Sequence, residues 1–565
     1  MIKFSEIPYQ RPDTEALCAQ MDALSAALEA ANTPEAAAKI IEQADAMAKS
    51  FFSNKTVSDI RYTQNTQDPF YTGEQDFMAG AEPAFGEKFI AFQRAMLKSP
   101  HRAALEQMLP KVAFLNAEIA QRAISPEILP DLEAEQKLAL EYQQALGSLM
   151  VDFDGQRLPM PKMALYTQSA DRHQRRAASE ACGKALSEKG QIFDEIFDKM
   201  VALRNEIAHK LGFDNFIQLG YLRMNRNSYG HGEVENFRRQ VKRELVPLVQ
   251  ALQKKQAGRL GLDTLKFFDA DVLRPGGNPR PVKAERELYE LGIQMYRDMK
   301  PETAEMVERM HATEAFDLYS RENKMAGGYC TFHTGVQSPF IFANFSGTAG
   351  DVEVFTHEGG HAFEAYVCRD QALLSITQPT LETCEVHSMG MEFMCWPYLD
   401  RFYGENAEVA KVIHLIGALY FIPYGCLVDE FQHKIYADPQ MTPAQRNETW
   451  EQLEREYFPD MDYDGLPFYS EGRRWQRQLH IYTDPFYYID YCLAQSCALQ
   501  ILAVQLEKGW DAAWEQYRAF TGHGGTLTFV QLLEGAGIKV PFVDGALKGI
   551  VGTVKAYIDQ NEGTL

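Results

Sequence analysis

The sequence lacks several features that mark whole classes of protein. Its 565 residues contain no continuous run of about 18 apolar residues, and the N-terminal segment has no apolar stretch of signal-peptide length. Lysine and arginine number 56 against 78 acidic residues, so the formal net charge is −22. Nucleic-acid binding is disfavoured, because phosphate contacts need clustered basic side chains. We therefore expect a cytoplasmic protein with no membrane or nucleic-acid partner.

Cysteine pairs and a phosphate-binding loop are also missing. The nine cysteines are odd in number and scattered, with no C-x-x-C pair. This favours reduced thiols over a disulfide framework or a cysteine-built zinc site. The glycine-rich run at 522–526 lacks the G-K-[ST] ending of a phosphate loop, so nucleotide binding is disfavoured. That run is either a mobile loop near a substrate or a simple turn.

Helical patterns dominate what is present. A chain of this length predicts two or more lobes, or one large helical body around a cavity. The segment Arg61–Tyr71, with its Asn, Asp and Pro residues, is predicted to be a loop. Apolar residues recur at helical spacing or with helix-forming composition over 13–30, 34–52, 77–98, 131–149, 192–211, 231–262 and 283–312.

Three short stretches have strand character instead. Residues 151–160 alternate around Asp154-Gly155, which predicts a hairpin. The ranges 327–334 and 339–345 are predicted to be short strands joined by a turn. An edge strand there could pair with an extended peptide, although a plain core hairpin is the alternative.

The run His357-Glu358-Gly-Gly-His361 contains the pattern H-E-x-x-H. On a helix, positions i and i+4 lie on the same face, so both imidazoles can reach one metal ion. Glu358 then stands beside them, where a carboxylate can activate a water molecule. A chance pentapeptide on an ordinary amphipathic helix is the alternative.

A third metal ligand must come from elsewhere, because catalytic zinc usually has three protein ligands. The longer pattern H-x-x-G-x-x-H is absent, since Glu364 and Val367 occupy its key positions. Downstream, a predicted helix over 381–394 carries three carboxylates among Met, Cys and Phe residues. Burying carboxylates there is costly unless charge or metal compensates them. We therefore favour compensated, buried carboxylates over the alternative that they lie on a solvent-exposed helix face. The three carboxylates are Glu382, Glu385 and Glu392.

An aromatic segment over 480–491 places four tyrosines and one histidine within twelve residues. Peptide hydrolysis develops an oxyanion that needs preorganised hydrogen-bond donors, and phenol or imidazole groups can serve. Aromatic rings can also line a peptide channel. The alternative is a buried aromatic helix start whose hydroxyls are satisfied locally.

These motifs together resemble the thimet oligopeptidase and oligoendopeptidase F family of zinc metallopeptidases, most closely its bacterial oligoendopeptidase F and Pz-peptidase branch. The resemblance is strong over about 200–550 and looser before that. It implies a mainly α fold, with a large helical body enclosing a deep substrate channel and a small β-sheet next to the H-E-x-x-H helix. It also implies an N-terminal helical region at 1–200 and a catalytic domain at 201–565. It rests on 344–351, 357–361, 385–392 and the aromatic segment.

Carried onto this sequence, the family pattern implies one zinc ion per chain, with Glu358 as general base. The implied zinc ligands are His357, His361 and Glu385. To Glu392 we assign the orientation of a ligand histidine. Gly359 departs from the family, in which many relatives carry a bulky residue. Two consecutive glycines cost a helix roughly 1 kcal/mol each relative to alanine, which indicates close backbone packing.

The family pattern also implies contacts to the substrate. His480 and Tyr491 would stabilise the oxyanion, and Tyr488 would contact the peptide. The predicted strands would hold the peptide extended, through Gly328, Tyr329 and Ala343.

The function expected from the sequence is a zinc-dependent endopeptidase that acts on short oligopeptides. One alternative is an exopeptidase of the dipeptidyl carboxypeptidase kind, which would need a charge clamp for a peptide terminus. Another is a non-catalytic peptide-binding protein, which would have no use for Glu358 beside the metal ligands.

Overall fold

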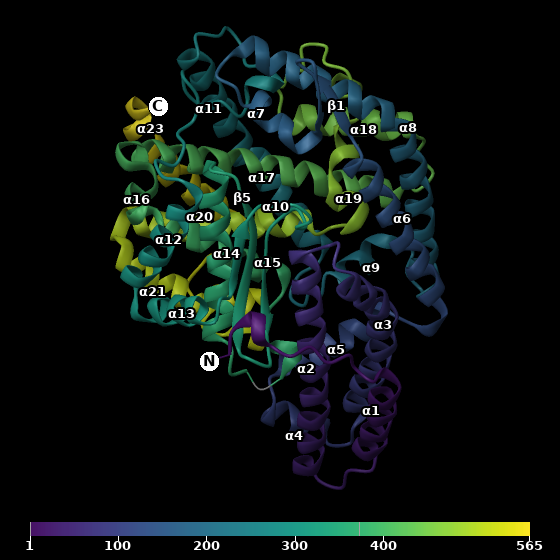
Figure 1. The fold of residues 1–565 in the computed structure, drawn as a ribbon. Coiled ribbons are helices and arrows are strands. Elements are labelled where there is room, and N and C mark those ends of the chain that lie inside the picture. Colours follow the sequence, from purple (N-terminus) through teal and green to yellow (C-terminus); the bar gives the residue numbers. More distant parts are fainter. Residues whose placement is uncertain (1, 372) are drawn as a thin grey trace. The chain divides into compact units, whose positions relative to one another are not determined.

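The computed structural model describes residues 2–371 and 373–565 and is mainly α-helical, with two small β-sheets (Figure 1). The predicted helical fold class is confirmed. The helices form two compact units, each assembled from three separate segments of the chain. Unit 1 comprises Met1–Arg122, Arg280–Glu405 and Glu507–Ile538, and unit 2 comprises Ala123–Pro279, Asn406–Leu506 and Lys539–Leu565.

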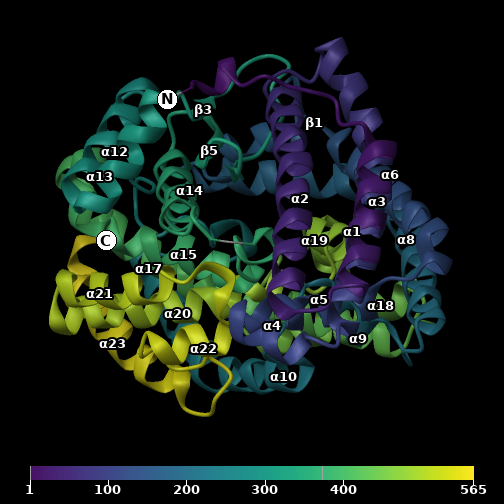
Figure 2. The same ribbon diagram turned by 90° about the horizontal axis from the view of Figure 1, so that it is seen from below.

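Three N-terminal helices of unit 1 lie side by side in both views (Figures 1 and 2). Each begins at a side chain that accepts a backbone amide of the first turn, which supplies an otherwise missing hydrogen bond. These caps are Asp13, Thr33 and Asp68. The helices are α1 (Thr14–Glu29), α2 (Pro34–Gln64) and α3 (Pro69–Lys98).

The predicted loop at Arg61–Tyr71 is mostly wrong. Helix α2 continues through Gln64 and α3 starts at Pro69, so the connection shrinks to residues 65–68. Asp68 and Pro69, which we took as loop residues, are instead the cap and the first position of α3. Proline fits the first helical position because its missing amide has no helical partner there.

A three-stranded sheet precedes the H-E-x-x-H helix, in the order β3-β5-β4. The central strand β5 (Ser338–Phe345) is antiparallel to β4 (Tyr329–His333) and parallel to β3 (Phe316–Tyr319). We did not predict β3. The buried Lys324 ammonium joins β3 to the central strand β5, because it donates to Asp317 Oδ1 at 2.8 Å and to the Ala343 carbonyl at 2.5 Å.

Among the remaining helices of unit 1, α13 and α14 pack on this sheet. In Figure 1, α14 and α15 lie next to each other, and their residues make the most extensive contact between any two elements. The bounds are α4 (Arg102–Met108), α5 (Lys111–Ala123), α12 (Glu285–Met299), α13 (Pro301–Ala312), α14 (Ala349–Val367), α15 (Leu381–Met394), α16 (Asp400–Tyr403), α21 (Trp510–Thr521) and α22 (Phe529–Gly535).

Unit 2 contains the predicted hairpin and the longest helix. Strands β1 (Met150–Phe153) and β2 (Gln156–Pro159) are antiparallel, and Asp154 and Gly155 both have positive φ, as a type I′ turn requires. The bounds of its helices are α6 (Leu129–Gly147), α7 (Ala164–Thr167), α8 (Arg172–Lys210), α9 (Phe216–Arg223), α10 (His231–Gln240), α11 (Val246–Arg259), α17 (Ala407–Ala437), α18 (Pro443–Tyr457), α19 (Leu479–Thr483), α20 (Tyr488–Lys508) and α23 (Ala546–Asn561).

Two stretches are long and apolar enough to cross a membrane by length and composition, Asp400–Ala437 and Tyr488–Lys508. Each is apolar on average rather than continuously, and 67% of its most apolar window is buried inside the protein. Core helices of water-soluble proteins pass the same test. All nine cysteines are free, in keeping with the predicted absence of a disulfide framework.

Candidate metal centre

The helix that carries H-E-x-x-H has a well-defined start. The carboxylate of Asp351 accepts the backbone amides of Ser346, Gly347 and Thr348, at 3.0, 2.6 and 3.3 Å. These amides and those of the first turn have no helical partner, and a carboxylate at this end also complements the helix dipole. The segment 344–351, which carried part of the family resemblance, thereby fixes where α14 begins beside the sheet.

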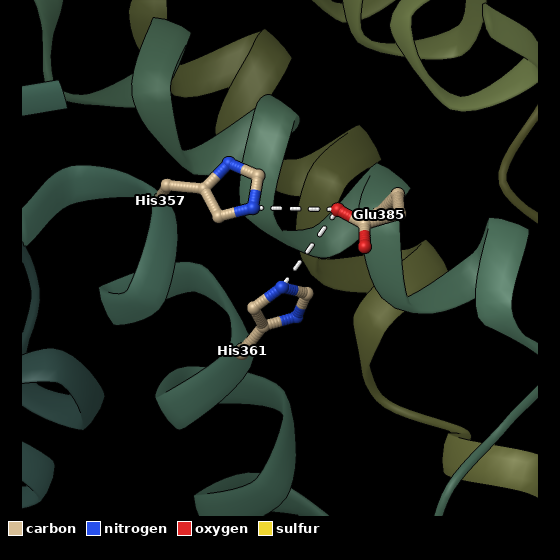
Figure 3. Close-up of side chains that lie close together, drawn as sticks. All are labelled: His357, His361 and Glu385. Atoms are coloured by element: carbon tan, nitrogen blue, oxygen red, sulfur yellow. Dashed lines mark ion pairs between the residues drawn. The ribbon is translucent and has the colours of Figure 1, made fainter. Parts of the chain in front are cut away.

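Two helices bring the three predicted ligands together. His357 and His361 lie one turn apart on α14, and Glu385 reaches them from α15 (Figure 3). Nε2 of His357 lies 3.3 Å from Oε2 of Glu385, and Nε2 of His361 lies 3.8 Å from the same oxygen. All three ligand atoms fall within 4.8 Å of one another.

This arrangement fits a tetrahedral zinc ion. Zinc bonds of about 2.0–2.2 Å at tetrahedral angles hold ligand atoms about 3.3–3.6 Å apart, which is close to the separations found here. Two imidazoles and one carboxylate are also a known catalytic ligand set, because three protein ligands leave a fourth position for water or substrate.

Further contacts hold two of these ligands in place. Nδ1 of His357 lies 2.7 Å from Oε1 of Glu392, so Nε2 is the nitrogen left for a metal. A carboxylate in this position fixes the ring orientation of a ligand histidine. The hydroxyl of Ser388 donates to Oε2 of Glu385 at 3.0 Å. We did not predict Ser388, whose place one turn after Glu385 on the helix was the available signal.

The consecutive glycines clear space on two sides of α14. A Cβ atom at Gly359 would overlap the hydroxyl of Tyr296 on α12, and one at Gly360 would overlap the His387 carbonyl and lie 2.6 Å from Cα of Ser388. The close packing indicated by the sequence is therefore present. Gly360 lets the backbones of α14 and α15 approach each other, and Gly359 makes room for a buried tyrosine.

Burial controls the charge of the groups around the site. It raises the pKa of Glu358 to about 7, with the nearby Glu385 carboxylate adding to this effect and His357 opposing it. Burial also lowers the pKa of His361 to about 4, which keeps its imidazole neutral. For His357, burial acts in the same direction, but Glu385 and Glu392 outweigh it and raise the pKa. The excess of carboxylates suits a divalent cation.

Comparison with protein families identifies the chain. The model described as Peptidase family M3 matches residues 165–551, and that of the Peptidase M3 N-terminal domain matches 4–124. The chain belongs to peptidase family M3. It is a metallopeptidase, as the sequence resemblance predicted. No curated protein matches the chain at a significant level.

Solved structures agree with this placement of the M3 peptidase. Pz peptidase A with an inhibitor is 39% identical, with a TM-score of 0.94 and 100% coverage of both chains. A protein assigned as oligoendopeptidase F is also 39% identical, with a TM-score of 0.94 and 99% coverage of both chains. Another, from Bacillus anthracis str. Ames, is 35% identical, with a TM-score of 0.90 and coverage of 100% of this chain and 99% of its own.

In this M3 peptidase, strand β4 leaves one edge of the sheet unpaired within the described residues. The amide of Ile341 in β5 donates to Ala315 on the β3 side at 3.0 Å. The residue opposite it in β4 is Cys330, so these two residues form a non-hydrogen-bonded pair of the antiparallel ladder. The backbone N–H and C=O of Cys330 therefore point to the open edge. On that side the Cys330 backbone faces the Glu358 carboxyl and acts to lower its pKa. Because backbone groups alternate along a strand, the N–H and C=O of Phe332 face the same edge.

Two of the predicted substrate contacts do not fit this sheet. Tyr329 pairs with Phe342 through its backbone, and its hydroxyl lies 2.7 Å from Oγ1 of Thr63. Ala343 lies in the central strand, is 1% exposed, and its carbonyl accepts from Lys324. Gly328 directly precedes β4 and stays a prediction. The error arose because strand order, which decides which strand is an edge, could not be read from the sequence.

The aromatic segment forms a cluster within unit 2. The ring of His480 lies 4.9 Å from that of Tyr488 and 6.0 Å from that of Tyr491, measured between centroids. All three side chains are half-buried. Nδ1 of His480 also lies 3.0 Å from Nε2 of the Gln478 side chain. The three residues are thus neighbours, and their role in catalysis stays a prediction.

Proposed function

We propose that this M3 peptidase is a zinc-dependent endopeptidase that hydrolyses internal bonds of short peptides. The observation that carries the proposal is the convergence of three ligand atoms from α14 and α15 within 4.8 Å, directly beside Glu358. Family membership supports a metal and a peptide substrate. The names of the similar solved structures, Pz peptidase A and oligoendopeptidase F, support short peptides.

In this proposal, His357, His361 and Glu385 bind the ion. Zinc held there would supply Lewis-acid chemistry, polarising a peptide carbonyl and lowering the pKa of water toward neutrality. Glu358 takes a proton from the attacking water and delivers it to the leaving amine. Burial disfavours the charged form of this carboxyl, which favours its acceptance of a proton from water.

The open edge of β4 supplies the proposed peptide-binding surface. The carbonyl of Cys330 and the backbone groups of Phe332 would pair with an extended peptide, as in other complexes that add a strand to a sheet edge. Gly328 would extend this contact at the start of the strand. In unit 2, His480 and Tyr491 are proposed as donors to the oxyanion and Tyr488 as a further peptide contact, supported by their clustering.

The proposal also covers the location, the partners and the domain division of the enzyme. We propose a cytoplasmic enzyme whose partners are short peptides, with no nucleic-acid or membrane partner, in keeping with the charge of −22. We also propose that residues 1–200 form an N-terminal helical region and 201–565 the catalytic domain. The matches at 4–124 and 165–551 support a division of this kind.

Two alternatives predict different behaviour. An exopeptidase of the dipeptidyl carboxypeptidase kind requires a free peptide terminus, whereas an endopeptidase cleaves peptides blocked at both ends. A non-catalytic binder would retain peptides without cleaving them, although Glu358 next to the ligands favours catalysis.

A length series of internally quenched peptides, acetylated and amidated at their ends, tests the proposal. We expect cleavage of short peptides, loss of cleavage with a chelator, recovery on adding zinc, and no cleavage of a folded protein. Cleavage only of peptides with free ends would favour the exopeptidase. Activity that is indifferent to the chelator would contradict the metal mechanism.

A further inference from the structure

Helix α2 runs alongside β4, the strand that forms the open sheet edge. At one end of the strand, Oγ1 of Thr63 lies 2.7 Å from the hydroxyl of Tyr329. Just past the other end, Oγ of Ser53 lies 2.5 Å from Oγ1 of Thr334, which also donates to the Lys49 carbonyl at 3.3 Å. Both ends of β4 are thus held by side chains of one helix.

The two elements match in length as well. From Ser53 to Thr63 an α-helix rises about 15 Å, at 1.5 Å per residue. From Tyr329 to Thr334 an extended chain covers about 16 Å, at 3.2–3.4 Å per residue. Helix and strand therefore stay in step over the whole length of β4, with the two hydroxyl pairs fixing their register.

The loop before the strand is held by the same helix. The amide of Met325 donates to the Thr63 carbonyl at 2.9 Å, and the amide of Thr66, just after α2, donates to the Asn323 carbonyl at 2.8 Å. Arg321 donates to the Gln64 carbonyl at 2.9 Å. These backbone contacts continue the attachment of β4 into the preceding loop, at the C-terminal end of α2.

Helix α2 also contacts the connection between the two metal-bearing helices. Oδ1 of Asp45 accepts the amide of Leu374 at 2.6 Å, and Nζ of Lys49 donates to the Gln371 carbonyl at 3.4 Å. Leu373 and Ile376 are buried in the same apolar cluster as Ile41 and Phe51 of α2. One rigid helix is therefore attached both to the open strand and to the connection from α14 to α15.

We propose that α2 is a positioning element, which sets the place of the β4 edge relative to the metal centre and thereby the binding of extended peptides. Thr63 and Ser53 are its positioning residues; neither belongs to the metal site, and both act through β4. This inference rests on the proposed function, because it takes β4 as the peptide-binding edge. The family's N-terminal domain, matched at 4–124, then contributes to substrate binding without supplying a catalytic group.

The test compares Thr63→Val with Thr56→Val in the zinc-loaded enzyme. Both changes remove a threonine hydroxyl from α2, but among the described residues Thr56 Oγ1 bonds only its own helix, at the Phe52 carbonyl. We expect KM for a blocked peptide to rise about three- to tenfold in Thr63→Val, as loss of one hydrogen bond would cause. We expect kcat and zinc content to stay within twofold, and Thr56→Val to match the wild type.

Three further variants separate positioning from a general loss of folding. Thr63→Ser keeps the hydroxyl and should restore the wild-type KM. Tyr329→Phe removes the other half of the pair, so adding it to Thr63→Val should raise KM no further. Ser53→Ala, at the far end of β4, should also raise KM.

Two results would overturn the inference. One is a KM for Thr63→Val equal to that of Thr56→Val. The other is a fall in kcat with unchanged KM, which loss of folded enzyme would produce. Failure of the proposed function is a separate outcome, since the wild-type enzyme itself would then show no chelator-sensitive cleavage.

Discussion

The metal centre and the open sheet edge of unit 1 are built by different means. In the candidate metal centre, α14 and α15 make direct backbone contact at Gly360, and all three proposed ligands lie on helices. In β4, the groups offered to a peptide are backbone groups, and their direction depends on the neighbouring strand and on α2. The first region depends on the identity of side chains, and the second on the order of the elements around it.

This difference separates two kinds of mutation. Changes in the α14–α15 contact should act first on metal binding, and changes around β4 should act first on KM. A mutation near β4 that releases the metal, or a change in the α14–α15 contact that alters only KM, would break the distinction.

The largest effect is expected from Gly360→Ala. Its Cβ would overlap backbone atoms of α15, which cannot move without carrying Glu385 away from the histidines. We expect loss of bound zinc, loss of hydrolysis, and a fall of about 2–3 kcal/mol or more in unfolding free energy. Metal analysis and urea unfolding measure these.

Gly359→Ala is the matched control, because its Cβ would meet a side chain instead, the hydroxyl of Tyr296. We expect a smaller loss of stability, partly restored in the double variant Gly359→Ala/Tyr296→Phe. The same Tyr296→Phe change should give Gly360→Ala no relief. Equal rescue of both glycine variants would contradict the assignment of separate neighbours.

The second effect concerns Glu364, a buried carboxyl farther along α14. Burial raises its pKa to about 8, and no described residue hydrogen-bonds its Oε1. Between about pH 5 and 8 the folded state then binds a proton that the unfolded state has released, so unfolding free energy falls as pH rises. We expect the wild type to lose a few kcal/mol over this range.

Glu364→Gln should reduce that pH dependence by the part due to Glu364, which urea unfolding at several pH values would measure. The exposed Glu353, also on α14, provides the matched control as Glu353→Gln. The account of Glu364 fails if its Gln variant and the wild type show the same slope with pH.

An intermediate effect is expected from Glu392→Gln. The change keeps the size of the side chain but removes the charge that faces Nδ1 of His357. We expect metal affinity or kcat to fall 10- to 100-fold. Glu382→Gln, on the same helix, should change neither by more than twofold, because Glu382 accepts from Thr380. Similar losses in both variants would point to a general disturbance of α15.

The smallest effect is expected from changes to the substrate. Replacing the amides of a blocked peptide by esters, one at a time, removes single N–H donors. Because strand edges alternate, KM should rise about two- to tenfold at every second position and stay near the wild-type value between them. Equal effects at all positions would contradict pairing with β4.

The sequence predicted the geometry of the candidate metal centre well because helix geometry follows from spacing. His357 and His361 had to share a face once they lay on one helix, and a buried carboxylate row pointed to Glu385. Ser388 and Tyr296 were missed because their roles depend on which atoms they meet after folding. The glycine pair indicated close packing but could not say which neighbours caused it.

The sheet shows where sequence reasoning stops. Strands β4 and β5 were predicted. Strand β3 was not, because it is only four residues long and lacks a clear alternating pattern. Without it, β5 could not be identified as the central strand, and Ala343 was wrongly given a substrate contact. The clustering of His480, Tyr488 and Tyr491 was expected from their spacing, whereas their catalytic roles stay predictions.

The central claim is that Glu358 moves the proton while the ligands alone hold the metal. The most direct test measures zinc content and hydrolysis of a blocked quenched peptide in Glu358→Gln, with Glu364→Gln as a matched change on the same helix. We predict wild-type zinc content in both, hydrolysis reduced at least about 1,000-fold in Glu358→Gln, and near wild-type hydrolysis in Glu364→Gln at pH 7. Hydrolysis retained by zinc-loaded Glu358→Gln would contradict the account.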